Sequence, residues 1–292
     1  MKTVLITGAS SGIGLATTIA AAREGWTAVA GVRDPACCED LRTAADAAGV
    51  SVGVRRLDVT DADSIEACLA GTVEQYGGLD ALVNNAGIAQ NGATLEFCDL
   101  DTVRELFEVN FFGVLAMTRA ALPHLRASRG RLVTIGSTRG IIGQPFNETY
   151  SAAKFAVEGF LESFAPVAAE VGVAVSIIEP GPVVGTRYGT GLDPAFTREF
   201  LLGETGPYAP LYRAYFEWAA REGLPGSQTA DEVAEAVLGC LSDASPAFRV
   251  PTSAWAAAYI QRKHHDADGS AIQQLTRPMV HPDPARVHVG TR

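Results

Sequence analysis

The sequence lacks the features that mark several protein classes. No apolar run is long enough to span a bilayer, and the brief one at the N-terminus is broken by Thr7-Gly8, too early for a secretory signal. The five cysteines are odd in number and show no C-x-x-C spacing, which predicts reduced thiols and no zinc site. The five histidines have no partners at metal-ligand spacing. We therefore expect a cytoplasmic protein that binds no metal.

Positive charge is also scarce. The chain has 23 Lys and Arg against 33 Asp and Glu, which gives a formal net charge of -10. A surface of that sign is not drawn to nucleic-acid phosphates or anionic lipids, so we expect no nucleic-acid partner and no membrane partner. With 292 residues, 47% of them hydrophobic and 19% charged, the chain has the balance and length of a globular protein with a sizeable core.

What the chain does contain is an alternation of short apolar segments with helical patterns. Repeated β-α units of this kind predict an α/β protein with a parallel sheet covered by helices on both faces. No internal repeat and no linker of disordered composition interrupts the pattern, so we expect one domain over residues 1–292. The predicted strands are 3–7, 27–32, 51–57, 80–84, 131–136, 173–179 and 248–250, and the main predicted helices are 12–24, 36–48, about 15 residues after Asp61, 99–127, 149–171 and 229–241.

The most informative stretch is the turn T-G-A-S-S-G-I-G at residues 7–14. It follows an apolar strand and opens a helix, which is the setting of a diphosphate site. Gly8 permits the sharp turn, Gly12 lets the backbone approach a diphosphate, and Gly14 lets the helix pack closely on the strand. The turn therefore predicts that the chain binds a dinucleotide, with a G-x-x-x-G-x-G spacing in place of the commoner G-x-G-x-x-G.

Ser137, Tyr150 and Lys154 predict the chemistry. Tyr150 and Lys154 are four residues apart at the start of a predicted helix, so they share a face. A ketone that accepts hydride becomes an alkoxide and needs a proton, which tyrosine can supply when a nearby ammonium and an oxidised nicotinamide favour its phenolate form. Lys154 can provide that ammonium and bond the nicotinamide ribose. Ser137, just past a strand, can hold the substrate oxygen.

These motifs resemble the short-chain dehydrogenase/reductase family. The glycine-rich turn, N-N-A-G at 84–87, N-x-x-G at 110–113, Ser137, Y-S-A-A-K at 150–154 and E-P-G-P-V at 179–183 occur in family order across residues 1–190. The resemblance implies a single-domain Rossmann-type doubly wound parallel sheet. It also adds Asn110 to the catalytic group, as the residue that holds a water in the proton relay to Lys154.

The resemblance implies a set of cofactor contacts as well. Asp58 would contact the adenine ring, and Pro180-Gly181 would contact the nicotinamide end. The family's spacing is P-G-x-x-x-T, whereas four residues separate Gly181 from Thr186 in this chain. The expected contact of Thr186 with the carboxamide therefore departs from the family pattern. The residues expected to bind the cofactor are Gly8, Ser10, Ser11, Gly12, Ile13, Gly14, Arg33, Asp58, Val59, Asn85, Ala86, Gly87, Tyr150, Lys154, Pro180, Gly181, Val183 and Thr186.

The end of the second strand bears on the choice of nicotinamide. A preference for NAD(H) would need a carboxylate there to bond both ribose hydroxyls. In family register that position is Val32, and Arg33 follows it. A guanidinium suits a 2′-phosphate, to which Ser11 could add a hydroxyl, whereas Asp34 lies beyond the ribose. We therefore favour NADP(H). An NAD-dependent oxidising dehydrogenase is the alternative, and a non-catalytic cofactor sensor is disfavoured because the catalytic residues are all present.

The likeness extends to one group within the family. V-R-D-P at 32–35, the segment 144–159 and R-V-P-T-S at 249–253 resemble the 17β-hydroxysteroid-dehydrogenase group, which acts on bulky apolar molecules. The aromatic-rich segment 187–228 would then be a substrate lid and 251–292 a C-terminal extension. We expect a bulky, apolar carbonyl or alcohol substrate, although a biosynthetic ketoreductase fits equally well. The resemblance also implies a homodimer or homotetramer, which light scattering would test.

Overall fold

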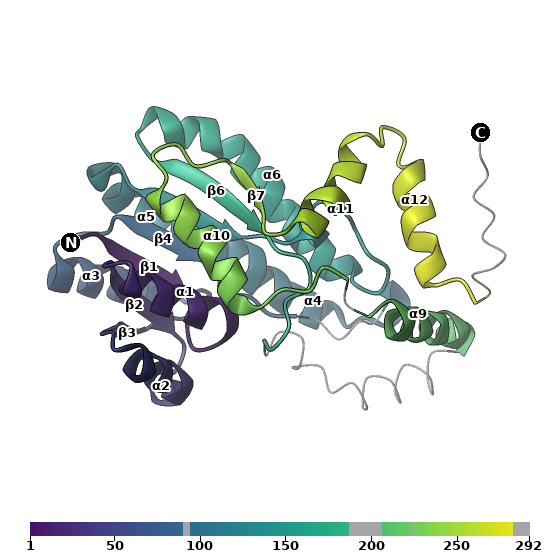
Figure 1. Ribbon diagram of the computed structural model, residues 1–292, viewed down its shortest axis with the longest axis horizontal. Coiled ribbons are helices and arrows are strands. Elements are labelled where there is room, and N and C mark those ends of the chain that lie inside the picture. Colours follow the sequence, from purple (N-terminus) through teal and green to yellow (C-terminus); the bar gives the residue numbers. More distant parts are fainter. Residues whose placement is uncertain (90–93, 187–205, 224, 283–292) are drawn as a thin grey trace.

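One parallel sheet of seven strands forms the centre of the molecule (Figure 1). The computed structural model describes residues 1–89, 94–186, 206–223 and 225–282. Strand order is β3-β2-β1-β4-β5-β6-β7, so the chain starts at the middle, runs outward to β3, and then crosses back to place β4 beside β1. This is the doubly wound topology that the sequence predicts. The strands are β1 (Thr3–Thr7), β2 (Thr27–Val32), β3 (Gly53–Arg56), β4 (Ala81–Asn84), β5 (Arg131–Ile135), β6 (Ala174–Glu179) and β7 (Arg249–Pro251).

Helices cover both faces of the sheet, and alternate residues of each strand pack against them. In β1, Val4 and Ile6 join the core under α1, α2 and α10, whereas Leu5 joins the core under α3, α5 and α6. All of β1 is buried, as expected for a central strand with helices on both sides. The helices are α1 (Gly12–Arg23), α2 (Glu39–Ala48), α3 (Ala62–Tyr76), α4 (Leu100–Phe107), α5 (Gly113–Ser128), α6 (Glu148–Glu170) and α10 (Ala230–Ser242).

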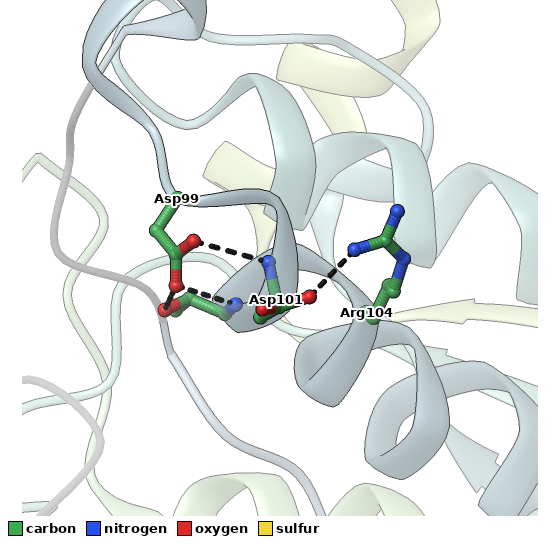
Figure 2. A network of polar contacts seen from close by, with 4 residues as sticks. Asp99, Asp101 and Arg104 are labelled. Atoms are coloured by element: carbon green, nitrogen blue, oxygen red, sulfur yellow. Dashed lines mark hydrogen bonds and ion pairs between the residues drawn. The ribbon is translucent and has the colours of Figure 1, made fainter.

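Local polar chemistry sets the ends of these helices. The Asp61 carboxylate accepts hydrogen bonds from two backbone N–H groups at the start of α3, as the sequence predicts. Thr229 and Glu232 form a reciprocal capping box at α10. Figure 2 shows Asp99 capping α4 through the N–H groups of Asp101 and Thr102. The Asp101–Arg104 ion pair beside it is 2.6 Å long but exposed, so it contributes little to stability.

Two predicted helices differ in detail from the structure. The 36–48 helix is divided at Cys38 into a short 3₁₀ turn, η1 (Pro35–Cys37), and α2. The long 99–127 helix is α4 and α5 joined by a π-helical stretch, η3 (Glu108–Phe112). A π-helical turn adds one residue to the usual α-helical spacing, so residues before and after it face directions that a 3.6-residue period does not anticipate.

Of the segments after β6, α10 packs against α1, whereas α9, α11 and α12 lie away from the N-terminus (Figure 1). Of the predicted lid, residues 187–205 and 224 lie outside the described residues, and most of the rest forms α9. Its Tyr212 stacks on Phe146 with ring centroids 4.0 Å apart. The elements here are η5 (Gly206–Tyr208), α9 (Ala209–Glu222), α11 (Ala254–His264), α12 (Ser270–Thr276) and η6 (Arg277–Met279).

The outer surfaces bear on two further expectations. No helix within the described ranges has the length and apolar character to cross a membrane. Large apolar side chains are exposed along η3 and α6, among them Phe112, Phe155 and Val167. Such side chains suit packing against a second copy, and the homo-oligomer stays a prediction.

Two buried carboxyl groups lie at the β6–β7 edge of the sheet. The Arg249 guanidinium on β7 is 3.2 Å from Glu158 of α6 and 3.3 Å from Glu179 of β6, and it pairs at 2.6 Å with the exposed Glu162. Burial raises the pKa of Glu158 and of Glu179 to about 7 each, and Arg249 offsets only part of that cost. Glu179 also has Glu158 as a like-charged neighbour, which raises its pKa further.

Replacing Glu179 with Gln should therefore stabilise the protein above neutral pH. The folded-state pKa of Glu179 lies above its unfolded value of 4.5. Protonation of Glu179 therefore makes its full contribution to the free energy of unfolding below pH 4.5, and this contribution is lost as the pH rises through 7. We expect Glu179→Gln to raise Tm by about 2–4 °C at pH 8.5, which corresponds to roughly 1 kcal/mol, and to change it little at pH 5.5. Thermal unfolding followed by circular dichroism measures this.

Glu162→Gln is the matched control, because it removes a carboxylate from the same Arg249 but from an exposed position. Glu162→Gln should not raise Tm at pH 8.5. A lower Tm for Glu179→Gln at pH 8.5 would show that attraction to Arg249 outweighs the cost of burial.

Candidate active site

The glycine-rich turn is tied to the loop after β4. The hydroxyl of Thr7, the last residue of β1, accepts hydrogen bonds from the backbone N–H groups of Asn85 and Ala86, both at 2.9 Å. In return the Asn85 side-chain amide donates to the carbonyls of Thr7 at 2.8 Å and Gly8 at 3.1 Å. These bonds join two loops that lie 77 to 79 residues apart in sequence. They fix the turn at the point where the strand order reverses, which is where ligands bind in such sheets.

The backbone of this turn leaves no room for side chains. Gly8 and Gly12 have φ of +66° and +56°, a region that favours glycine. A Cβ on Gly8 would lie 2.8 Å from the Cα of Ala86, and one on Gly14 would collide with the Asn85 amide and the Gly8 carbonyl. Ser11 precedes α1 without a side-chain cap, so its side chain does not occupy the N–H groups of the first turn. A bare backbone at a helix N-terminus fits the diphosphate of a dinucleotide.

The three predicted catalytic side chains come from adjoining elements at the carboxyl edge of the sheet. Ser137 follows β5 and caps the short turn η4 (Thr138–Gly140), where its Oγ accepts from the Arg139 N–H at 3.1 Å. Tyr150 lies in the first turn of α6, and Lys154 is one turn further on. The Lys154 ammonium donates to the carbonyl of Ile135 at 2.8 Å and lies 6.0 Å from the centre of the Tyr150 ring. Both side chains are largely buried, so their positions are fixed before any ligand binds.

Asn110 lies in the π-helical stretch between α4 and α5 and is fully buried. Its amide pairs with the backbone of Ile88, accepting from the N–H at 2.8 Å and donating to the carbonyl at 2.9 Å. A Cβ on Gly87 would lie 3.2 Å from the Asn110 Oδ1. Asn110 therefore holds the N-N-A-G loop in place. Its role with a relay water stays a prediction.

Two arginines flank the expected adenosine end. Val32, the last residue of β2, is buried and pairs with Arg56 in the β2–β3 register, and Arg33 follows it. The pKa of Asp58 is lowered, mainly by hydrogen bonds from Thr60 and further by the charges of Arg33 and Arg56. Both guanidinium groups therefore lie near Asp58. Arg56 was not among the predicted site residues, and its position at the end of the third strand is the signal that could have found it.

Asp34 serves a local purpose. Its carboxylate accepts from the Ala36 N–H at 2.8 Å and from the Cys37 thiol at 3.2 Å, which caps η1. A carboxylate committed to its own turn agrees with the prediction that Asp34 does not bind the ribose.

Residues at the expected nicotinamide end also come together. The Pro180 carbonyl accepts from the Thr138 N–H at 3.0 Å, which joins the P-G segment to the turn after Ser137. Despite its unusual spacing, Thr186 lies against the glycine-rich turn: a Cβ on Gly12 would be 3.3 Å from its methyl group. A Cβ placed on Gly181 would lie 3.0 Å from the ring of Trp255 on α11, so this ring covers Gly181. Trp255 was not among the predicted site residues. The carboxamide contact of Thr186 stays a prediction.

The remaining predicted residues divide into two kinds. Ser10 lies in the turn itself, and Val183 forms a bridge with Gln228 beside the P-G segment. The side chains of Ile13 and Val59 pack into the two cores, which leaves a cofactor contact to their main-chain atoms. Throughout the parts of the chain that the structure describes, no cluster of His, Cys, Asp and Glu is arranged to hold a metal ion.

Known proteins resemble this chain over most of its length. The family described as short chain dehydrogenase matches residues 2–194. Retinol dehydrogenase 8 of Bos taurus is 35% identical over 297 residues, covering 100% of this chain and 94% of its own. The 17-beta-hydroxysteroid dehydrogenase type 1 of Homo sapiens is 32% identical, covering 98% of this chain and 88% of its own.

Solved structures show the same likeness. A short-chain dehydrogenase from Streptomyces avermitilis superposes with a TM-score of 0.73 at 30% identity, covering 94% of this chain and 97% of its own. An actinorhodin polyketide ketoreductase solved with NADPH gives a TM-score of 0.71 at 31% identity, covering 86% of this chain and 95% of its own.

α1 lies so close to the Asn85 loop that a single methyl group added at Gly14 should disturb the contact between them. Gly14→Ala should push the Asn85 amide away from Thr7 and Gly8, at the cost of about 1–3 kcal/mol that overpacking typically carries. We expect a lower Tm and NADPH binding weakened at least about 10-fold, as measured by nicotinamide fluorescence. Gly78→Ala is the control, because a Cβ there meets nothing within 4 Å. Unchanged NADPH binding by Gly14→Ala would show that the turn does not hold the cofactor.

Proposed function

This chain belongs to the short-chain dehydrogenase family. We propose that it uses NADP(H), because the uncharged Val32 and the Arg33 guanidinium at the end of β2 suit a 2′-phosphate, and that Tyr150 is the proton donor and acceptor. It is an oxidoreductase that acts on alcohols or ketones with a nicotinamide cofactor. The observation that carries the proposal is the set of Ser137, Tyr150 and Lys154 at one sheet edge, beside a turn built for a diphosphate. The alternative is that the protein is a dehydrogenase that uses NAD to oxidise an alcohol.

The protein's part in the reaction is to orient groups and to move one proton. The bound nicotinamide supplies or accepts the hydride. Ser137 Oγ accepts a hydrogen bond from Arg139, which leaves its own hydroxyl hydrogen to donate to the substrate oxygen. The Lys154 ammonium is anchored on the Ile135 carbonyl and lies 6.0 Å from the centre of the Tyr150 ring. The Tyr150 hydroxyl then gives its proton to the alkoxide that forms, or takes one from an alcohol.

The substrate proposal rests on the surroundings of α9. Phe146 lies four residues before Tyr150, and it contacts both Tyr212 and Tyr215 of α9, with ring centroids 4.0 and 5.3 Å apart. This aromatic cluster lies next to the start of the catalytic helix. It suits a bulky apolar substrate, as do the names of relatives that act on retinol and on hydroxysteroids.

Removal of the Tyr150 hydroxyl tests the chemical role. We expect Tyr150→Phe to lower kcat by about 10²–10⁴-fold, the usual contribution of a general acid, while NADPH binding stays within about twofold. The measurement is oxidation of NADPH with a panel of bulky ketones, next to fluorescence titration of the cofactor. Tyr76→Phe removes a hydroxyl at the end of α3 and should change neither quantity. Binding of NADPH without turnover of any ketone would instead favour a cofactor-sensing protein.

Removal of the Arg33 charge tests the cofactor. A charge-assisted hydrogen bond to phosphate is worth about 1.5–3 kcal/mol, so Arg33→Gln should lower kcat/KM for NADPH by about 10–100-fold. NADH, which lacks the 2′-phosphate, should be used as before. Arg23→Gln, at the exposed end of α1, removes the same charge elsewhere and should leave both values unchanged. An unaltered kcat/KM for NADPH in Arg33→Gln would favour the NAD-dependent alternative.

A further inference from the structure

Arg139 lies two residues after Ser137 and is held between the two segments that carry the catalytic hydroxyls. Its backbone N–H donates to Ser137 Oγ at 3.1 Å, and its guanidinium donates to the side-chain carbonyl of Asn147 at 2.8 Å. Asn147 precedes α6 and stands three residues before Tyr150. The half-buried guanidinium is therefore fixed beside the site that would receive the substrate carbonyl.

The positive charge of Arg139 has no carboxylate partner within the described residues. Ion pairs there involve Arg104, Arg221 and Arg249, whereas the hydrogen bond of the Arg139 side chain is to a neutral amide. Other described arginines also lack an ion pair, so what distinguishes Arg139 is its half-buried position beside Ser137 and Asn147. A partly buried charge costs free energy unless another group compensates it.

Other polar groups surround the same position. Burial raises the pKa of the Tyr259 hydroxyl on α11, and the charges of Arg139 and Arg262 oppose that rise, so both cations lie near it. Gln144 and Tyr215 lie within 3.5 Å of each other on the neighbouring loop and α9. The acid on this part of α6 is Glu148, which accepts from Thr94. The Tyr259 hydroxyl is thus a further hydrogen-bond donor near Arg139.

A guanidinium offers five N–H donors in a planar fork that matches a carboxylate, and the bond to Asn147 engages one nitrogen. A hydrogen bond that only joined η4 to α6 would need a single donor, which a neutral side-chain amide could supply equally well. Excess positive charge and unused donors beside a substrate site point to an anionic ligand.

We propose that Arg139 binds a carboxylate of the substrate, which is then a ketone or secondary alcohol with an apolar body and an acidic group. This rests on the proposed function and specifies its substrate class. The carboxylate lies on the part of the substrate that extends from the carbonyl toward α11. Arg139 thereby selects acids over neutral molecules of the same shape, and its effect falls mainly on KM because the charge is bound alike before and during hydride transfer.

The test compares keto acids with their methyl esters. Probes are 4-oxopentanoate, 6-oxoheptanoate and 8-oxononanoate, which vary the separation between carbonyl and carboxylate. With NADPH, the wild-type protein should prefer at least one acid over its ester by about 10–100-fold in kcat/KM. In Arg139→Gln that ratio should fall to about one, through a higher KM for the acid. Arg139→Lys should restore part of it, and Arg23→Gln should resemble the wild type.

Two outcomes would overturn the proposal while leaving the oxidoreductase intact: esters reduced as well as the acids at every length, or an acid preference that survives in Arg139→Gln. If no probe is turned over, the proposed function fails separately. Calorimetric titration of the NADPH complex with each acid and its ester then tests the carboxylate site. Tighter binding of an acid than of its ester, lost in Arg139→Gln, still supports the carboxylate site. Equal binding rejects it. Unchanged Tm values confirm that the variants are folded.

Discussion

The hydrogen bonds between Thr7 and the Asn85 loop are the constraint on which the site depends. They join the ends of β1 and β4, the neighbouring strands between which the chain reverses its direction of winding. Because those loops are locked together, Gly8 and Gly14 must be free of Cβ atoms, and the start of α1 presents bare backbone. Gly12 has a positive φ and faces Thr186 instead. Asn110 extends the same network by fixing Ile88, so the cofactor side of the site is rigid before ligands arrive.

The other side of the site is organised by α6. Tyr150, Lys154 and Glu158 succeed one another at four-residue intervals, and so lie along one face of that helix. Lys154 is anchored on the Ile135 carbonyl, and its charge partly offsets the cost of burying Glu158 beneath it. The helix therefore connects the Tyr150 hydroxyl to the group of Glu158, Glu179 and Arg249 at the β6–β7 edge of the sheet. Its position relative to β5 and β6 is set by electrostatics as well as by packing.

Charge is distributed unevenly in this acidic chain. Arg33 and Arg56 lie at the expected adenosine end, and Arg139 lies beside Ser137. The cations thus gather where our proposals place a 2′-phosphate and a substrate carboxylate. A positive site in a negative protein concentrates anions locally even though the whole molecule repels them. The net charge of -10 therefore does not describe the charge at the ligand sites that we propose.

The sequence alone determined the β-α alternation and the position of the glycine-rich turn, because periodicity and short motifs are local properties of a chain. The catalytic roles of Ser137, Tyr150 and Lys154 stay predictions from the same motifs. The predicted NADP(H) preference, the homo-oligomer and the cytoplasmic location stay predictions. Only the tertiary structure decided which distant residues meet. Strand register brought Arg56 beside Val32, the fold returned Thr186 to Gly12, and α11 placed Trp255 over Gly181. The π-helical stretch that positions Asn110 and the burial of Glu179 against Arg249 also depend on packing between segments far apart in sequence, which no local pattern records.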